Sequence, residues 1–164
     1  MPVHRLDNAR WGFDSNCFVC EAGNQAGLGI AFFHDDEAGV VFAEFALGPG
    51  FSGSPRYVHG GVTLAVLDEA MAWTTIAVAG KFALTLSTEA RFLRPVAVDR
   101  HHRVEARLVD HPGPDGHLSL AGVVLDGRGR RCVEATSRFA VMSPAVADSA
   151  IGALAVHDAR YVGG

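Results

Sequence analysis

The sequence has little cysteine and no excess of positive charge, and each shortage excludes a class of protein. Three Cys in 164 residues are too few for the disulfide framework of a small secreted domain. The chain has 14 Lys+Arg against 18 Asp+Glu, a formal net charge of −4. This balance argues against nucleic-acid binding, which needs a concentrated basic face. Residues 1–7 carry charged side chains and no apolar stretch of a secretory signal. We therefore expect a cytoplasmic protein.

The sequence does contain enough apolar residues for one folded domain. It is 49% hydrophobic and 20% charged, and its length is typical of a single domain. This composition excludes disorder over most of the chain. We divide the sequence into an irregular N-terminal segment at residues 1–27, a single domain at 28–142 and an Ala- and Gly-rich tail at 143–164.

Residues 59–79 indicate one long, buried helix. The segment contains no Lys, Arg or Pro and is apolar on nearly every side. A membrane span is disfavoured because Asp68 and Glu69 lie adjacent in its middle, together with three threonines. A helix that is hydrophobic all round in a chain of this kind is a core helix. Gly80 is the expected C-terminal cap.

The segments on both sides of this helix have the pattern of β-strands. Apolar and polar residues alternate in 81–94, 103–110, 117–126 and 131–142, and tight turns join the last three into an antiparallel meander. Two shorter runs before the helix, at 28–34 and 40–47, predict a hairpin. The expected architecture is α+β, with a curved antiparallel sheet wrapped around one helix. A second copy is expected to cover the remaining helix face, which predicts a homodimer.

Gly60 and Gly61 follow His59 at the point where a loop becomes this helix. The first amide N–H groups of a helix have no partner within it, and the helix dipole adds partial positive charge there. Without side chains, the two glycines let a substrate oxygen approach these donors, as in an oxyanion hole for a carbonyl. The alternative is that the pair only lets the backbone turn.

Asp68 and Glu69 lie in a segment otherwise suited to burial. A buried carboxylate is costly without partners, so it indicates either a functional acid or a structural one bonded to a neighbouring Thr. Adjacent helical residues point roughly 100° apart, so the two acids cannot face the same way. Asp68 comes eight positions after Gly60, roughly 12 Å along a helix at ~1.5 Å per residue. One carbonyl cannot reach both within one chain, which predicts two active sites shared across a dimer.

Several of these segments together resemble the PaaI-like (phenylacetate-degradation) group of hotdog-fold thioesterases. The resemblance lies in the His-Gly-Gly run at 59–61, the acidic segment at 67–70 and the Arg-Phe-Leu-Arg-Pro segment at 91–95. The Cys-Phe-Val-Cys segment at 17–20 and the Gly-Leu-Gly segment at 27–29 are similar to the opening of many members. Together they extend over residues 17–142, nearly the whole chain apart from its tail.

This resemblance implies the hotdog fold, dimers that often pair into tetramers, and hydrolysis of acyl-coenzyme A thioesters without a metal or cofactor. It implies that the Gly60 amide polarises the thioester carbonyl. Asp68 matches the catalytic carboxylate, as nucleophile or as general base on water. His59 matches the histidine that shapes the thioester end of the pocket. No nucleic-acid or membrane partner is expected.

Further substrate-binding candidates come from the same comparison and from the charge of coenzyme A. They are Gly61, Glu69, Ser87, Thr88, Arg94 and Arg56. A hydroxyl on the strand after the helix positions the attacking water in some members, which points to Ser87 or Thr88. The phosphates of coenzyme A need cations, which points to the two arginines, although an exposed Arg is commonly only a solvated side chain.

Two alternatives remain open at this stage. Cys17-x-x-Cys20 has the spacing of half a zinc site, with His4 and His34 as possible completing ligands. No second pair follows, so we predict no metal. A non-catalytic acyl-CoA-binding protein is the alternative to an enzyme. A hotdog hydratase is disfavoured because that subgroup has a His five residues after the Asp, where this chain has Trp73.

Overall fold

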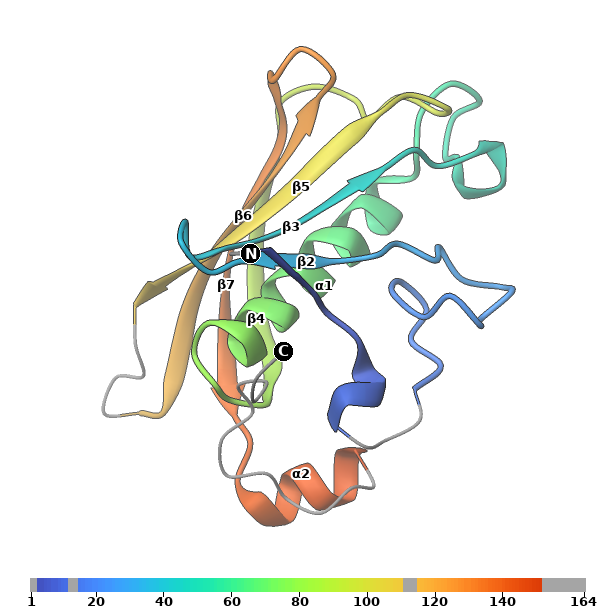
Figure 1. The fold of residues 1–164 in the computed structure, drawn as a ribbon. Helices are drawn as coiled ribbons and strands as arrows, with labels where there is room; N and C mark the ends of the chain where they lie inside the picture. The colour runs from blue at the N-terminus through green and yellow to red at the C-terminus, as the bar shows by residue number, and fades with distance from the viewer. Residues whose placement is uncertain (1–2, 12–14, 111–114, 152–164) are drawn as a thin grey trace.

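The computed structural model describes residues 3–11, 15–110 and 115–151 (Figure 1). The strands are β1 (Val3–Arg5), β2 (Phe33–Asp35), β3 (Val40–Phe45), β4 (Ala83–Phe92), β5 (His102–Asp110), β6 (His117–Asp126) and β7 (Arg131–Val141). The helices are α1 (Gly60–Ala77) and α2 (Pro144–Ile151), with short 3-10 turns at Asn8–Trp11 and Pro49–Phe51. The predicted central helix and the four long strands that follow it are confirmed.

The strands form one antiparallel sheet that curves around α1 (Figure 1). Its order is β1-β2-β3-β5-β6-β7-β4. Strands β5, β6 and β7 are neighbours in sequence order, which confirms the predicted meander. Strand β4 follows the helix in the chain but pairs with β7, so it forms one edge of the sheet.

The core lies between α1 and the concave face of the sheet. Val66, Leu67 and Met71 of the helix are completely buried and belong to the same apolar cluster as side chains of β3, β5, β6 and β7. Gly122 of β6 lies under the helix, where a Cβ atom would come 3.0 Å from Leu67. Glycine at this position therefore permits the close approach of helix and sheet.

The two ends of α1 have recognisable caps. His59 is the N-cap residue, and its Nδ1 accepts a hydrogen bond from the Gly61 N–H at 2.9 Å. At the other end Gly80 has a positive φ of 68° and its N–H donates to the carbonyl of Ile76 at 3.1 Å. Gly80 therefore ends the helix as predicted, although the C-cap residue itself is Val78.

The structure differs from the sequence prediction most in the N-terminal part. The strand expected at 28–34 is reduced to β2, because the backbone just before it pairs elsewhere. The N–H of Leu28 donates to the carbonyl of Phe18 at 2.8 Å, and that of Ile30 to Val19 at 2.9 Å. Residues 3–5, expected to be irregular, add β1 to the sheet. The N-terminal segment therefore packs on the domain that follows it.

The alternation in residues 81–94 predicts one apolar face for β4, but the structure divides it: Leu84 pairs with Ala140 and Phe92 with Val133, an odd number of residues apart on β7, so these two side chains lie on opposite faces of the sheet. Leu84, Leu86 and Phe92 are 50%, 52% and 55% exposed. The pairing with β7 also has an irregularity between Thr85 and Ser87, which shifts the register there. An edge strand with exposed apolar side chains is typical of an interface.

The tail was expected to be partly helical, and α2 confirms this for its first residues. Residues 152–164 lie outside the described residues. No helix in the described part of the chain combines the length and the apolar character needed to cross a bilayer.

Candidate active site

The N-terminus of α1 opens onto a cavity of about 330 Å³. Gly60 lines it together with Phe92 and Arg94. The Gly60 residue is exposed, and within the described residues no acceptor takes its N–H. A Cβ at this position would lie 3.6 Å from the Phe92 ring, an ordinary contact. The cavity therefore presents a first-turn amide donor beside an aromatic wall.

His59 distinguishes the two glycine amides from each other. Its ring accepts the Gly61 N–H, so this amide is already occupied. A Cβ at Gly61 would come within 3.1 Å of the His59 Nδ1, so glycine is what allows the ring to cap the helix. Of the two predicted donors, the Gly60 N–H is the one left for a substrate oxygen, while Gly61 fixes the position of His59.

Asp68 lies about two turns further along α1 and is half-buried. Its Oδ1 accepts a hydrogen bond of 2.7 Å from the hydroxyl of Thr85 on β4. A purely structural acid would also be hydrogen-bonded to a threonine. Here, however, Thr85 is exposed, so the hydrogen-bonded pair lies at the surface. The pair is an accessible carboxylate with an oriented hydroxyl beside it.

Thr85 is absent from the candidates chosen by sequence. Ser87 and Thr88 were chosen instead, and the structure places both exposed residues along a different cavity of about 640 Å³. The Thr88 hydroxyl is hydrogen-bonded to that of Ser137 at 2.7 Å. The alternation of residues 81–94 placed Thr85 among the polar positions, but only the sheet register shows which hydroxyl meets Asp68.

Glu69 points to the N-terminal segment, away from the Gly60 cavity. The Cys17 thiol donates to its Oε1 at 3.3 Å, and the Cys20 N–H donates to the Cys17 sulfur at 3.3 Å. A hydrogen bond from Cys20 lowers the pKa of Cys17 to about 5, while burial raises the pKa of Glu69 to about 8. The pKa of Cys20 is also raised, first by its bond to Cys17. The cluster thus resists holding more than one negative charge.

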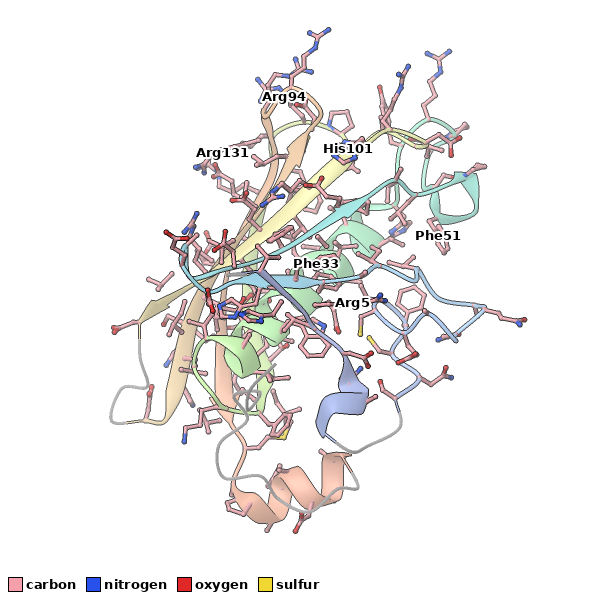
Figure 2. The ribbon with its side chains drawn as sticks, viewed as in Figure 1. Arg5, Phe33, Phe51, Arg94, His101 and Arg131 are labelled. Carbon is pink, nitrogen blue, oxygen red and sulfur yellow. The ribbon has the colours of Figure 1, made fainter. Side chains whose placement is uncertain are left out.

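The predicted arginines lie on the same end of the molecule as the glycines but differ in their contacts. Arg94 lines the Gly60 cavity, and its guanidinium donates to the carbonyl of Arg131 at 3.0 Å (Figure 2). Arg56 is exposed in the loop before α1. Arg94 is therefore the predicted cation that the structure brings to the cavity.

A second, basic cleft adjoins this cavity through Pro95, which lines both. Its volume is about 560 Å³, and Arg100 and Arg128 are among its lining residues. Neither of these two has an ion pair among the described residues, whereas Asp126 beside them is occupied by Arg130 at 2.8 Å. The cleft was not predicted from the sequence, because its lining residues come from the start of the Arg-His-His-Arg run at 100–103 and from residues 126–130, which are far apart in the chain.

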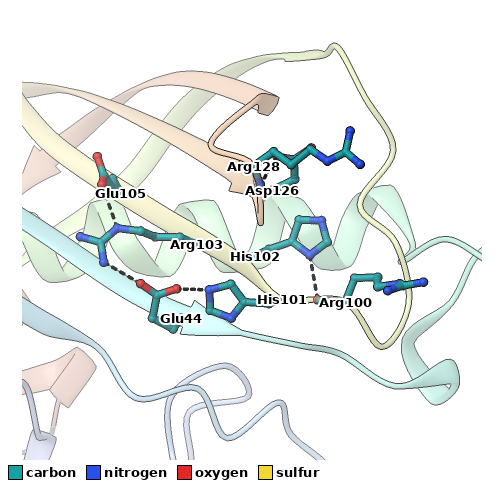
Figure 3. A network of polar contacts seen from close by, with 8 residues as sticks. All are labelled: Glu44, Arg100, His101, His102, Arg103, Glu105, Asp126 and Arg128. Atoms are coloured by element: carbon teal, nitrogen blue, oxygen red, sulfur yellow. Dashed lines mark hydrogen bonds and ion pairs between the residues drawn. The ribbon is translucent and has the colours of Figure 1, made fainter.

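The two histidines of that run, His101 and His102, both contact other residues of the protein. His102 is buried and its Nδ1 bonds to the carbonyl of Arg100 at 2.9 Å (Figure 3). His101 lies 2.6 Å from Glu44, which also holds Arg103 at 2.6 Å (Figure 3). Of the two arginines in the run, Arg100 lines the cleft and has no carboxylate partner in the part of the chain that the structure describes.

Part of the chain is similar to a known protein family. Residues 56–110, from the loop before α1 to the end of β5, match the family model of the thioesterase superfamily. This part of the chain is therefore similar to the thioesterase superfamily. A match over α1 and β4 includes Gly60, Asp68 and Thr85, the residues that the geometry singles out. No curated protein matches the sequence.

Solved structures of the thioesterase superfamily share the hotdog fold of this chain. Protein RHA08564, a thioesterase superfamily protein, is 23% identical with a TM-score of 0.72 over 80% of this chain, which spans only 64% of its length. A phenylacetic acid degradation-related protein of Ralstonia eutropha, described as a putative thioesterase, is 27% identical with a TM-score of 0.59 over 74% of this chain and 88% of its own. PaaI of E. coli is 18% identical with a TM-score of 0.65 over 76% and 86%. The hotdog fold and the PaaI-like resemblance are confirmed.

Proposed function

We propose that this hotdog thioesterase hydrolyses acyl-CoA thioesters to the free acid and coenzyme A. The observation that carries the proposal is the exposed Gly60 N–H at a cavity, on the same helix as the accessible Asp68–Thr85 pair. Support for the coenzyme A moiety comes from a hotdog protein of Streptococcus mutans that was solved with acetyl-CoA, 19% identical with a TM-score of 0.59 over 64% of this chain and 82% of that chain.

The proposed reaction uses one amide and one carboxylate. The Gly60 N–H donates to the thioester carbonyl oxygen and stabilises the negative charge that develops on it. Asp68 takes a proton from a water molecule as the water oxygen attacks the carbonyl carbon, and Thr85 orients the carboxylate. The C–S bond then breaks, and the thiolate of coenzyme A leaves with the electron pair and takes up a proton. His59 caps α1 and so fixes the loop before the helix at the thioester end of the pocket.

The two groups come from two copies of the chain in this proposal. Asp68 lies eight positions after Gly60 on α1, roughly 12 Å along the helix, which is too far for one carbonyl to contact both. The exposed apolar side chains of edge strand β4 are suited to pairing with a second copy. Thr85, the hydrogen-bond partner of Asp68, lies on that strand, and in the proposed dimer the helix N-terminus of the second copy reaches Asp68 there. We propose a homodimer as the active unit, and a dimer of dimers as its further assembly.

Recognition of coenzyme A is assigned to the basic residues beside the cavity. Arg94 lines the cavity that contains Gly60, and Arg100 and Arg128 line the adjoining cleft. Guanidinium groups suit phosphate oxygens because they present several N–H donors in a fixed plane. The predicted binding of coenzyme A by Arg56 stays a prediction, and so does the cytoplasmic location.

The deciding experiment measures thiol release from a panel of aromatic and medium-chain aliphatic acyl-CoAs. We expect turnover by the wild-type protein and its loss in Asp68→Ala. Ser87→Ala is a matched control, because Ser87 lies on β4 two residues from Thr85 but along the other cavity. No hydrolysis above background for any substrate, with tight acyl-CoA binding retained in Asp68→Ala, would instead establish a non-catalytic acyl-CoA-binding protein.

A further inference from the structure

Two thiols and one carboxylate come together on the side of α1 that carries Glu69. One ligand atom each from Cys17, Cys20 and Glu69 lies within 4.8 Å of the other two. Two sulfurs and one oxygen at such distances can surround a single ion, because Zn–S and Zn–O bonds are about 2.3 Å and 2.0–2.2 Å long. Only a small inward movement of the side chains is needed to bring all three to bonding distance.

The backbone around the cysteines is arranged to support thiolate ligands. The N–H of Cys20 donates to the Cys17 sulfur at 3.3 Å, and the Asn8 side-chain amide donates to the Cys20 sulfur at 3.7 Å. Hydrogen bonds of this kind favour the charged form of a thiol and orient it, as supporting residues do around metal ligands. Both cysteines are free thiols. The site is therefore more than a chance meeting of side chains.

The position of the cysteines is fixed by the fold. The carbonyls of Phe18 and Val19, which lie between them, accept the N–H groups of Leu28 and Ile30. A Cβ at Gly27 would lie 2.4 Å from the Phe18 carbonyl oxygen, so glycine is required for this close pairing. Cys17 and Cys20 also pack against the main apolar core. The two sulfurs are thus held beside Glu69 by backbone structure.

The charge of the cluster is not balanced by the protein. Glu69 makes no ion pair with a Lys, Arg or His among the residues that the structure describes. A divalent cation reverses this situation, because it stabilises thiolate and carboxylate together.

We propose that Cys17, Cys20 and Glu69 form a binding site for a thiophilic divalent cation, Zn²⁺ first, that links the N-terminal segment to helix α1. The two sulfurs favour zinc over magnesium or calcium, which prefer oxygen ligands. Three protein ligands leave the fourth tetrahedral position for water. The sequence expectation of no metal is revised here, because the third ligand comes from Glu69 rather than from His4 or His34. The proposal is independent of the hydrolytic function.

The test is a titration of the reduced, metal-free full-length protein with Co²⁺, followed by displacement with Zn²⁺. We expect a thiolate-to-cobalt charge-transfer band that saturates at one ion per chain. Cys17→Ser and Cys20→Ser should each weaken binding more than tenfold, and Glu69→Gln should keep the band but weaken binding. Cys132→Ser is the matched control, since Cys132 is a buried free cysteine outside the cluster, and it should titrate as wild type.

A second measurement needs no variant, which matters if a substituted chain does not fold. Zn²⁺ should protect Cys17 and Cys20 of the wild-type protein from alkylation, as read from peptide masses. The absence of a cobalt band in the reduced wild-type protein overturns the proposal. So does a band that persists when both Cys17 and Cys20 are serine, equal alkylation with and without zinc, or a Cys17–Cys20 disulfide that survives reduction.

Discussion

Asp68 and Glu69 are adjacent in the chain, but their side chains contact different parts of the protein. Asp68 faces edge strand β4, where it accepts a hydrogen bond from an exposed threonine hydroxyl. Glu69 faces the N-terminal segment, where a thiol reaches it and burial raises its pKa to about 8. Adjacent helical residues point roughly 100° apart, which is enough for the two side chains to contact different segments. The role of an acid on α1 is therefore decided by what packs against that side of the helix.

The strongest test of this contrast exchanges each carboxylate for its amide. Asp68→Asn should lower kcat for acyl-CoA hydrolysis by about 10²- to 10⁴-fold, because the amide cannot accept the proton of water. Glu69→Gln removes the same charge one residue away and should leave kcat within about threefold of wild type. The measurement is thiol release under saturating substrate. Equal losses in the two variants would mean that the acids act as one site.

Metal addition should affect only the Glu69 side. At about 100 times its dissociation constant, Zn²⁺ should stabilise the wild-type protein by about 2.7 kcal/mol, since it binds the folded state alone. Thermal unfolding with and without zinc measures this. The shift should vanish in the Cys17→Ser and Cys20→Ser double variant and remain in Asp68→Asn. A zinc-dependent shift that disappears in Asp68→Asn but not in the double variant would contradict the proposed site, because zinc binding would then depend on Asp68 and not on the two cysteines.

On the Asp68 side, the hydroxyl of Thr85 should contribute less than the carboxylate that it orients. Thr85→Val keeps a β-branched side chain on β4 but removes the hydrogen bond, and we expect kcat to fall about tenfold, the effect of losing roughly 1.4 kcal/mol. KM should change little, and Thr85→Ser should restore most of the rate. Steady-state kinetics of the two variants separates an orienting hydroxyl from a merely structural one, for which serine and valine would behave alike.

The two adjacent glycines repeat the contrast at the start of α1, with a smaller effect. A Cβ at Gly61 would press on the His59 ring, whereas one at Gly60 meets only an ordinary contact with Phe92. Gly61→Ala should therefore weaken the N-cap and lower stability by about 0.5–2 kcal/mol. Gly60→Ala should be close to neutral in a denaturant titration. The reverse order of stabilities would contradict the capping role given to His59.

Much of the site could be predicted from the sequence because its parts are local. The absence of Lys, Arg and Pro from residues 59–79 predicted a core helix, and the helical repeat predicted that Asp68 and Glu69 diverge. Thr85 could not be predicted, because the register irregularity beside Ser87 is a property of the pairing between β4 and β7. The meeting of Cys17 with Glu69 was equally out of reach, since 52 residues separate them.

By itself the amino-acid sequence determined the elements: one helix without a polar face, a meander of strands, and a loop of small residues at the helix start. These follow from short-range periodicity and backbone freedom, which need no knowledge of distant contacts. The tertiary structure alone decided which hydroxyl meets Asp68, which amide stays open and where the two thiols lie. Such pairings depend on register and packing between segments far apart in the chain, and a shift of one residue changes the partner.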